Sequence, residues 1–214
     1  MKILLFSSPP KQKKQTVVEQ HGIDPVRLHI LYKAPPSEVL EWEDTSIVGM
    51  QRWLAKVLKL AETAGNTTST TSIPVLDKMS NEERDLYRET HTTIKQVTEA
   101  MSTTYSLNTA ISDLIKLSNY INTSSVQASS PVYQHAVRSL VTMMAPVTPT
   151  LGEESWEAIS RNDEKKSSVF AQSWPTFEEK ALEKDTIDCV IQVKKKMQLK
   201  ENYQDYCDGK WFFF

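Results

Sequence analysis

Basic side chains recur at helical spacing in this chain of 214 residues. Arg52, Lys56 and Lys59 are separated by four and three positions, so an α-helix would place them on one face. Such a stripe can follow the phosphates of a nucleic acid. An ordinary solvated helix face has the same pattern, so the spacing alone leaves both interpretations open.

Two further basic clusters have the same ambiguity. One is a pair at the start of a long predicted helix, and the other lies beside a predicted strand. The net charge of -2 provides no general positive field that would by itself indicate nucleic-acid binding. The candidate contacts are Arg52, Lys56, Lys59, Arg84, Arg88, Lys194, Lys195 and Lys196.

Residues that could catalyse a reaction form no recognisable centre. The histidines are His21, His29, His91 and His135. Their surroundings lack partners at metal-ligand spacing, which favours ordinary surface or partly buried histidines. Cys189 and Cys207 have no CxxC context and define no disulfide framework. A glycine-rich phosphate loop and a GxSxG motif are also missing, so we expect no catalytic residue, metal or cofactor in this chain.

Apolar periodicity predicts the helices that would position the basic residues. The strongest pattern covers residues 45–64, where Ile47, Leu54 and Ala61 belong to one apolar face. Ser80 begins a long helix, because Glu83 three residues later completes a capping box. Further helices are predicted from Asp24 to a point before Pro35 and near residues 107–121, 131–144 and 151–159, and one strand over 187–193. The expected fold class is therefore mostly α, a helix bundle with a small α/β-like C-terminal element.

Several short segments occur in an order that is similar to a known family. They include 22–36 (GIDPVRLHILYKAPP), 49–54 (GMQRWL), 107–112 (LNTAIS) and 144–149 (MAPVTP). Together with Ser173-Trp174-Pro175, the ordered set resembles the C-terminal part of a bacterial or mitochondrial-type leucyl-tRNA synthetase. That family belongs to the class I aminoacyl-tRNA synthetases, and the similarity covers roughly residues 16–196.

The resemblance implies a bundle of the anticodon-binding type that grips the body of leucine tRNA. The full-length family joins leucine to its tRNA in protein biosynthesis and uses ATP. Its HIGH-type motif is missing here, and residues 9–14 (PPKQKK) stand where its KMSKS loop is expected. The resemblance therefore implies a truncated tRNA-binding segment without the ATP site or the editing domain. Such a segment would be inactive alone, and its further partner would be a separate catalytic chain.

The same resemblance suggests four parts of the chain. Residues 1–15 are an irregular basic N-terminus, and 16–43 form a connector that resembles the end of the catalytic core. Residues 44–162 form the anticodon-binding-type bundle. Residues 163–214 are a C-terminal extension with one strand and a divergent tail that ends in Trp211–Phe214.

Two other functions are compatible with these residues. The first is a free-standing RNA-binding or splicing-assisting bundle that uses the same surface, and the second is a structural remnant that binds nothing. Preference for leucine tRNA would separate the tRNA-binding segment from both alternatives. The family type implies a mitochondrial location, with the cytoplasm as the alternative. No apolar run reaches the roughly 18 residues that a membrane helix needs, so no membrane partner is expected.

Overall fold

The computed structural model describes residues 17–33, 44–67, 72–161, 167–183, 187–193 and 196–203. A short helix over residues 17–21 comes first. The longer helices are α2 (Ile23–Lys33), α3 (Asp44–Gly65), α4 (Asn81–Ser102), α5 (Leu107–Thr123), α6 (Pro131–Met144) and α7 (Pro149–Ile159). The remaining elements are η1 (Leu76–Lys78), η2 (Val169–Ala171), α8 (Glu179–Leu182), β1 (Ile187–Val193) and β2 (Lys196–Tyr203). The chain is mostly α-helical, as its sequence predicts.

The helices begin where local capping residues predict. The Ser80 side chain accepts a hydrogen bond from the Glu83 N–H at 3.2 Å, and the Glu83 carboxylate accepts one from the Ser80 N–H at 3.2 Å. This capping box satisfies two N–H groups that the first turn of α4 leaves without helical partners. At the start of α6, Ser130 caps the Val132 N–H, and Pro131 occupies the first helical position.

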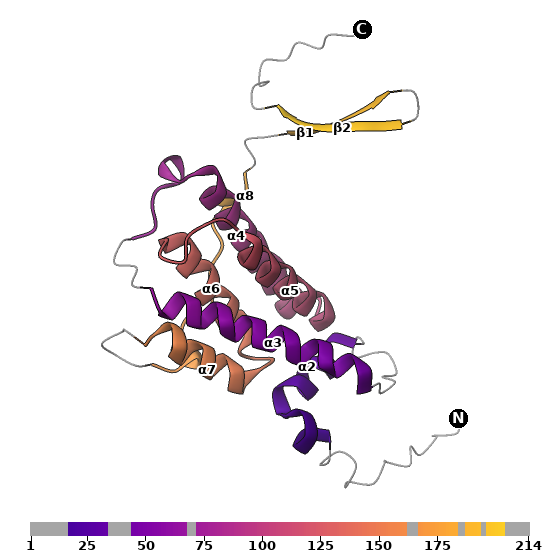
Figure 1. Ribbon diagram of the computed structural model, residues 1–214, viewed down its shortest axis with the longest axis vertical. Coiled ribbons are helices and arrows are strands. Elements are labelled where there is room, and N and C mark those ends of the chain that lie inside the picture. Colours follow the sequence, from indigo (N-terminus) through magenta and orange to yellow (C-terminus); the bar gives the residue numbers. More distant parts are fainter. Residues whose placement is uncertain are drawn as a thin grey trace.

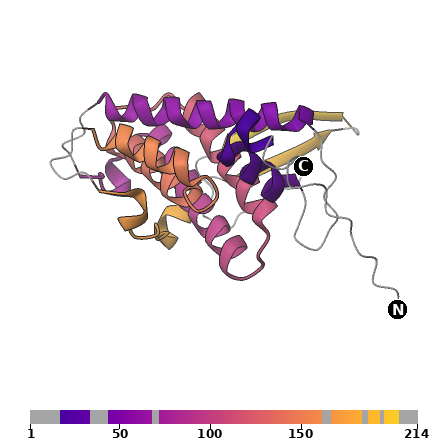
Figure 2. The same ribbon diagram turned by 90° about the horizontal axis from the view of Figure 1, so that it is seen from below.

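The helices pack as a bundle in which α4 and α5 form an adjacent pair (Figure 1). Helix α3 packs against α7, α6 and α2, while α4 also contacts α6 and α8. Figure 2 shows α3 running along one edge of the bundle, with α7 beside it. Within the described part of the chain, no helix is long and apolar enough to cross a membrane.

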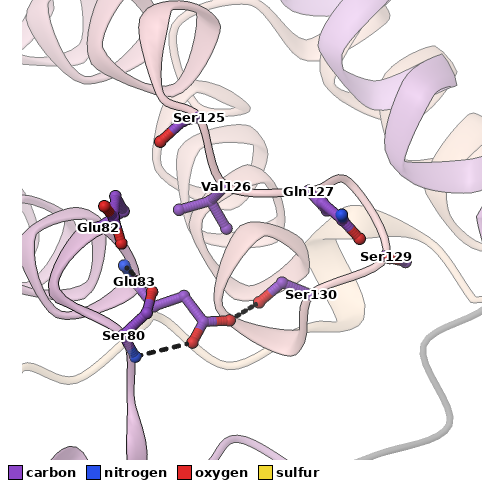
Figure 3. Close-up of a pocket in the computed structure, with 8 residues that line it drawn as sticks. All are labelled: Ser80, Glu82, Glu83, Ser125, Val126, Gln127, Ser129 and Ser130. Atoms are coloured by element: carbon purple, nitrogen blue, oxygen red, sulfur yellow. Dashed lines mark hydrogen bonds between the residues drawn. The ribbon is translucent and has the colours of Figure 1, made fainter.

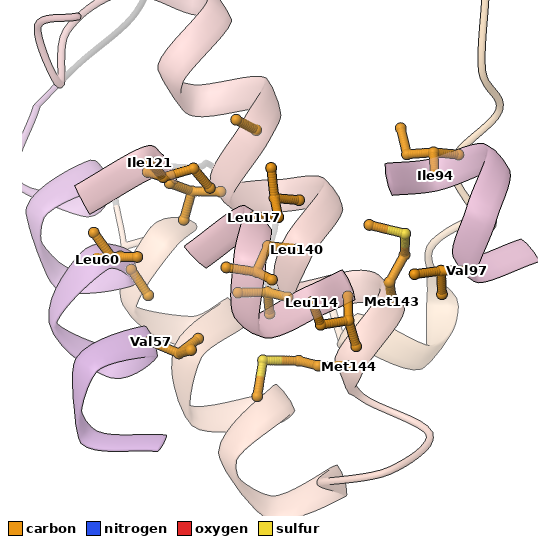
Figure 4. Close-up of a cluster of buried hydrophobic side chains, with 14 of the residues drawn as sticks. Val57, Leu60, Ile94, Val97, Leu114, Leu117, Ile121, Leu140, Met143 and Met144 are labelled. Atoms are coloured by element: carbon orange, nitrogen blue, oxygen red, sulfur yellow. The ribbon is translucent and has the colours of Figure 1, made fainter. Parts of the chain in front are cut away.

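The core is built from the predicted apolar stripes (Figure 4). Val57 of α3, Leu117 of α5 and Leu140 of α6 are completely buried where these helices meet. Trp53 and Trp156 are buried as well. Burial of these stripes is the main stabilising contribution, and it turns the opposite face of α3 toward solvent.

The C-terminal region contains the predicted strand and a second strand that the sequence did not reveal. Strand β1 has the predicted bounds and pairs antiparallel with β2, from Ile187↔Tyr203 to Val193↔Lys196. Strand β2 was missed because lysine and glutamate, which are depleted in strands, interrupt its apolar alternation. The predicted N-terminus over 1–15 and the tail Trp211–Phe214 lie outside the described residues. The limits of the four predicted parts stay predictions.

Candidate nucleic-acid interface

Helix α3 presents its predicted basic stripe on the face opposite the core. Arg52 and Lys59 are exposed, whereas Lys56 is half-buried. The buried side chains Leu54 and Val57 lie between them in sequence, so the helical period separates the charged face from the apolar one. Arg52 and Lys59 make no ion pair with another described residue, so no carboxylate in the described part of the chain neutralises either side chain directly.

Lys56 connects this stripe to the neighbouring helix. Its Nζ donates a hydrogen bond to Oδ1 of Asn119 on α5, at 2.6 Å. This contact holds one ammonium group at the junction between α3 and α5. Asn119 therefore belongs to the same surface, although no pattern in the sequence marks it, because the two residues are 63 positions apart.

Arg84 and Arg88 lie on a separate helix, α4, and both guanidinium groups bind other parts of the protein. Arg84 Nη2 donates to the Leu76 carbonyl oxygen at 3.3 Å. Arg88 Nε donates to the Glu183 carbonyl oxygen at 3.1 Å, and its Nη1 pairs with Asp85 at 2.7 Å. Only 17% of the Arg88 side chain is exposed, so much of its hydrogen-bonding capacity is used within the protein.

The third predicted cluster is described only in part. Lys194 and Lys195 lie outside the described residues, and Lys196 is the first residue of β2, where only the backbone is described. Of the predicted contacts, the structure therefore brings Arg52, Lys56 and Lys59 together on one helix face. It does not join the α4 arginines to that stripe.

A polar pocket lies where α4 and α6 begin (Figure 3). Its volume is about 460 Å³, and its lining consists of Ser80, Glu82, Glu83, Ser125, Val126, Gln127, Ser129 and Ser130. The Glu83 carboxylate accepts hydrogen bonds from the Ser80 N–H and, at 2.6 Å, from the Ser130 hydroxyl. An internal carboxylate thus already occupies the position that favours anions at these helix N-termini, so the pocket is unsuited to a phosphate.

His91 and His135 stack between α4 and α6, with ring centroids 5.3 Å apart. Burial lowers the pKa of each imidazole to about 4, so both are neutral at pH 7. Nδ1 of His91 accepts a hydrogen bond from the Glu178 N–H at 3.0 Å, which anchors the segment that precedes α8. His91 is only 2% exposed, deeper than the sequence suggested. Among the described residues, no group of three His, Cys, Asp or Glu side chains can hold a metal ion.

The helical architecture agrees with that of known proteins. A family model described as "Anticodon-binding domain of tRNA ligase" matches residues 83–206, which is more than half of the chain. The chain belongs to this family of anticodon-binding domains.

The more specific similarity is to leucine–tRNA ligases, as the sequence motifs predicted. The enzyme of Synechococcus elongatus is 39% identical over 180 residues, which cover 84% of this chain and 20% of the relative. The leucine–tRNA ligase of Nostoc punctiforme is 37% identical over 182 residues, which cover 85% of this chain and 20% of that relative. The chain thus spans about a fifth of the length of these curated relatives.

A solved structure has the same arrangement of helices. It is the crystal structure of the ternary complex of Agrobacterium radiobacter K84 agnB2 LeuRS with tRNA and LeuAMS. The match has a TM-score of 0.73 at 26% sequence identity, and it covers 89% of this chain and 24% of the other. The predicted fold and the predicted family are therefore both confirmed.

Proposed function

We propose that this chain is a tRNA-binding segment of a leucine–tRNA ligase, and that the exposed face of α3 contacts the tRNA backbone. The observation that carries the proposal is the stripe of Arg52, Lys56 and Lys59 on a bundle of the anticodon-binding family. Leucine tRNA is the proposed partner, because the curated relatives are leucine–tRNA ligases and the similar solved structure is a complex with tRNA.

The chemistry of the α3 face supports binding to the phosphate backbone of tRNA. Arg52 and Lys59 are exposed cations without a described carboxylate partner, so a phosphate can replace water and mobile ions around them. Lys56 is held against Asn119, whose amide adds hydrogen-bonding capacity beside the ammonium group. These groups recognise charge and shape rather than base sequence, and phosphate contacts generally position a protein on its nucleic acid.

The α4 arginines and the lysines at positions 194–196 are further candidate contacts. We infer that Arg84 and Arg88 make secondary contacts at most, since both also bind protein groups. Contacts from Lys194, Lys195 and Lys196 stay a prediction. We propose that the ligation of leucine takes place on a separate catalytic chain, which would also bind the ATP that the reaction consumes. We propose a mitochondrial location, and cell fractionation with a tagged chain would distinguish it from the cytoplasm.

The test is equilibrium binding to leucine tRNA and to an unrelated tRNA over a series of salt concentrations. We expect preference for leucine tRNA and a linear fall of log affinity with log salt. The double variant Arg52→Gln/Lys59→Gln should weaken binding and reduce the salt slope by about 2, since each lost phosphate contact removes about 1.

A matched control removes the same charge from another surface. Lys78 and Lys180 are exposed lysines of η1 and α8, and the variant Lys78→Gln/Lys180→Gln changes the net charge equally. The control should retain the slope of the unchanged chain. Equal losses in both variants would show a general charge effect and contradict the α3 site. Equal affinity for both tRNAs would favour a general RNA-binding bundle, and no binding at any salt would leave a structural remnant.

A further inference from the structure

Tyr105 lies in the turn between α4 and α5 with an unusually exposed side chain. Its exposed fraction is 69%, the largest among the large apolar side chains that the structure describes. Within the described residues, its ring contacts no other aromatic ring and its hydroxyl makes no hydrogen bond. Packing within the protein therefore gives no reason for an aromatic residue at this position.

The backbone of Tyr105 also disfavours the residue type that is present. Its φ is 51°, the only positive φ of a non-glycine residue in the described part of the chain. The turn is fixed by hydrogen bonds from Ser106 N–H to the Ala100 carbonyl at 2.9 Å and from Leu107 N–H to the Tyr105 carbonyl at 3.1 Å. Glycine adopts such a conformation without steric cost, so the fold alone would favour glycine over tyrosine.

The surroundings of the ring suit a nucleic acid. Residues 102–109 (STTYSLNT) carry no charge. The hydroxyls of Ser102, Thr104 and Ser106 donate to backbone carbonyls, and their remaining lone pairs can accept hydrogen bonds from the hydroxyl groups of a sugar. Tyr105 lies two positions before Leu107, the first residue of α5, and Asn119 of α5 accepts a hydrogen bond from Lys56 of the basic stripe. Leu107 and Asn119 are 12 positions apart, which corresponds to about 18 Å along the helix, a distance that one RNA molecule can bridge.

We propose that Tyr105 stacks on an unpaired base of the RNA that this chain binds. The inference rests on the proposed tRNA-binding function and adds a contact of a different kind. The α3 cations attract phosphates of any sequence, whereas an exposed aromatic ring selects nucleotides whose base face is accessible. Stacking on aromatic side chains is how many proteins hold single-stranded nucleotides, and it tolerates any base because each has a π-face.

The experiment compares Tyr105→Gly, Tyr105→Phe and the unchanged chain. Binding is measured to leucine tRNA, which has unpaired loops, and to a fully paired RNA duplex. Tyr105→Gly should weaken tRNA binding by roughly 5- to 100-fold, the loss expected for one stacked base, and leave duplex binding unchanged. Tyr105→Phe should bind tRNA as the unchanged chain does, because the ring remains. The salt slope should be the same in all three proteins, since stacking releases no counterions.

Two further measurements exclude a loss of stability and a general effect of removing an exposed aromatic ring. The unfolding midpoint of Tyr105→Gly should be no lower than that of the unchanged chain, because glycine relieves the left-handed backbone. Phe170→Ala removes a different exposed aromatic ring, in η2, and should not affect tRNA binding.

The possible failures are distinguishable. Normal tRNA affinity of Tyr105→Gly, or an equal loss in Phe170→Ala, would overturn the stacking role and leave the tRNA-binding proposal intact. Absence of RNA binding by the unchanged chain would overturn both proposals.

Discussion

Two glycines of α3 illustrate how single residues depend on their surroundings. A Cβ atom at Gly65 would overlap the backbone carbonyl of Ala158, because the end of α3 closely approaches α7. A Cβ atom at Gly49 would meet nothing within 4 Å. The same amino acid is therefore required for packing at one position, whereas at the other it only weakens the helix.

We predict opposite effects on stability for the two alanine substitutions. Gly65→Ala should lower the free energy of unfolding by about 1–3 kcal/mol, because backbone atoms of α7 would have to move. Gly49→Ala should raise it by about 0.5–1 kcal/mol through better helix propensity. Urea unfolding followed by circular dichroism measures both, and a neutral Gly65→Ala would contradict the close approach of α3 and α7.

The buried histidines predict a dependence of stability on pH. Burial lowers the pKa of His91 and of His135 to about 4 in the folded protein, against about 6.5 in the unfolded chain. Between these values the unfolded chain binds more protons, so the free energy of unfolding rises with pH. Stability should therefore fall as the pH is lowered from about 6.5 toward 4.

Urea titrations at pH 7, 6 and 5 check this prediction. They stay largely above the range in which ordinary carboxylates titrate. The variant His91→Gln removes one of the two titrating groups, so its stability should change less over the same interval. Identical pH dependence in both proteins would show that His91 does not titrate with a lowered pKa.

At the scale of elements, Glu83 connects two helix starts. Its carboxylate completes the capping box of α4 and also accepts a hydrogen bond from Ser130, the N-cap of α6. The capping box is visible in the sequence because its residues are three positions apart. The bond to Ser130 is not visible, because 47 positions separate the partners.

We predict that Glu83→Ala lowers the free energy of unfolding by about 1–2 kcal/mol, since the N-termini of both α4 and α6 lose a partner. The neighbouring Glu82 is exposed in the first turn of α4, and Glu82→Ala should cost only a few tenths of a kcal/mol. Chemical denaturation of the two variants measures the difference. Similar losses would mean that Glu83 acts only through the helix dipole.

For the whole molecule, the helices and the β-hairpin differ in how they are stabilised. The bundle has a common core, whereas β1 and β2 form a two-stranded sheet and pair with each other. Isolated two-stranded hairpins are marginally stable in water. The segment before the hairpin is part of the bundle, because Trp174 Nε1 donates to the Thr98 hydroxyl at 2.9 Å and Ala181 is buried.

Truncation after Glu183 should therefore change the free energy of unfolding by less than about 0.5 kcal/mol. Truncation after residue 166 also removes Val169, Trp174 and Ala181 from the bundle, so it should be clearly destabilising. Thermal and urea unfolding of the two shortened chains provide the comparison. A large loss in the longer of them would show that the hairpin stabilises the helices.

The sequence by itself determined the fold class, the main helices, the strand β1, the cap at Ser80 and the amphipathic character of α3. These features follow from residues within a few positions of one another, where helical or strand periodicity and capping chemistry operate. The ordered family motifs added the relationship to leucine–tRNA ligases.

The tertiary structure alone decided how the charged and polar residues are used. Lys56 donates a hydrogen bond to Asn119, and Arg88 donates one to the backbone carbonyl of Glu183. The ring of His91 stacks on the ring of His135. Each of these contacts joins residues of different elements, dozens of positions apart in the chain. Local spacing carries no information about such pairs, because they form only when the apolar faces of the helices pack together.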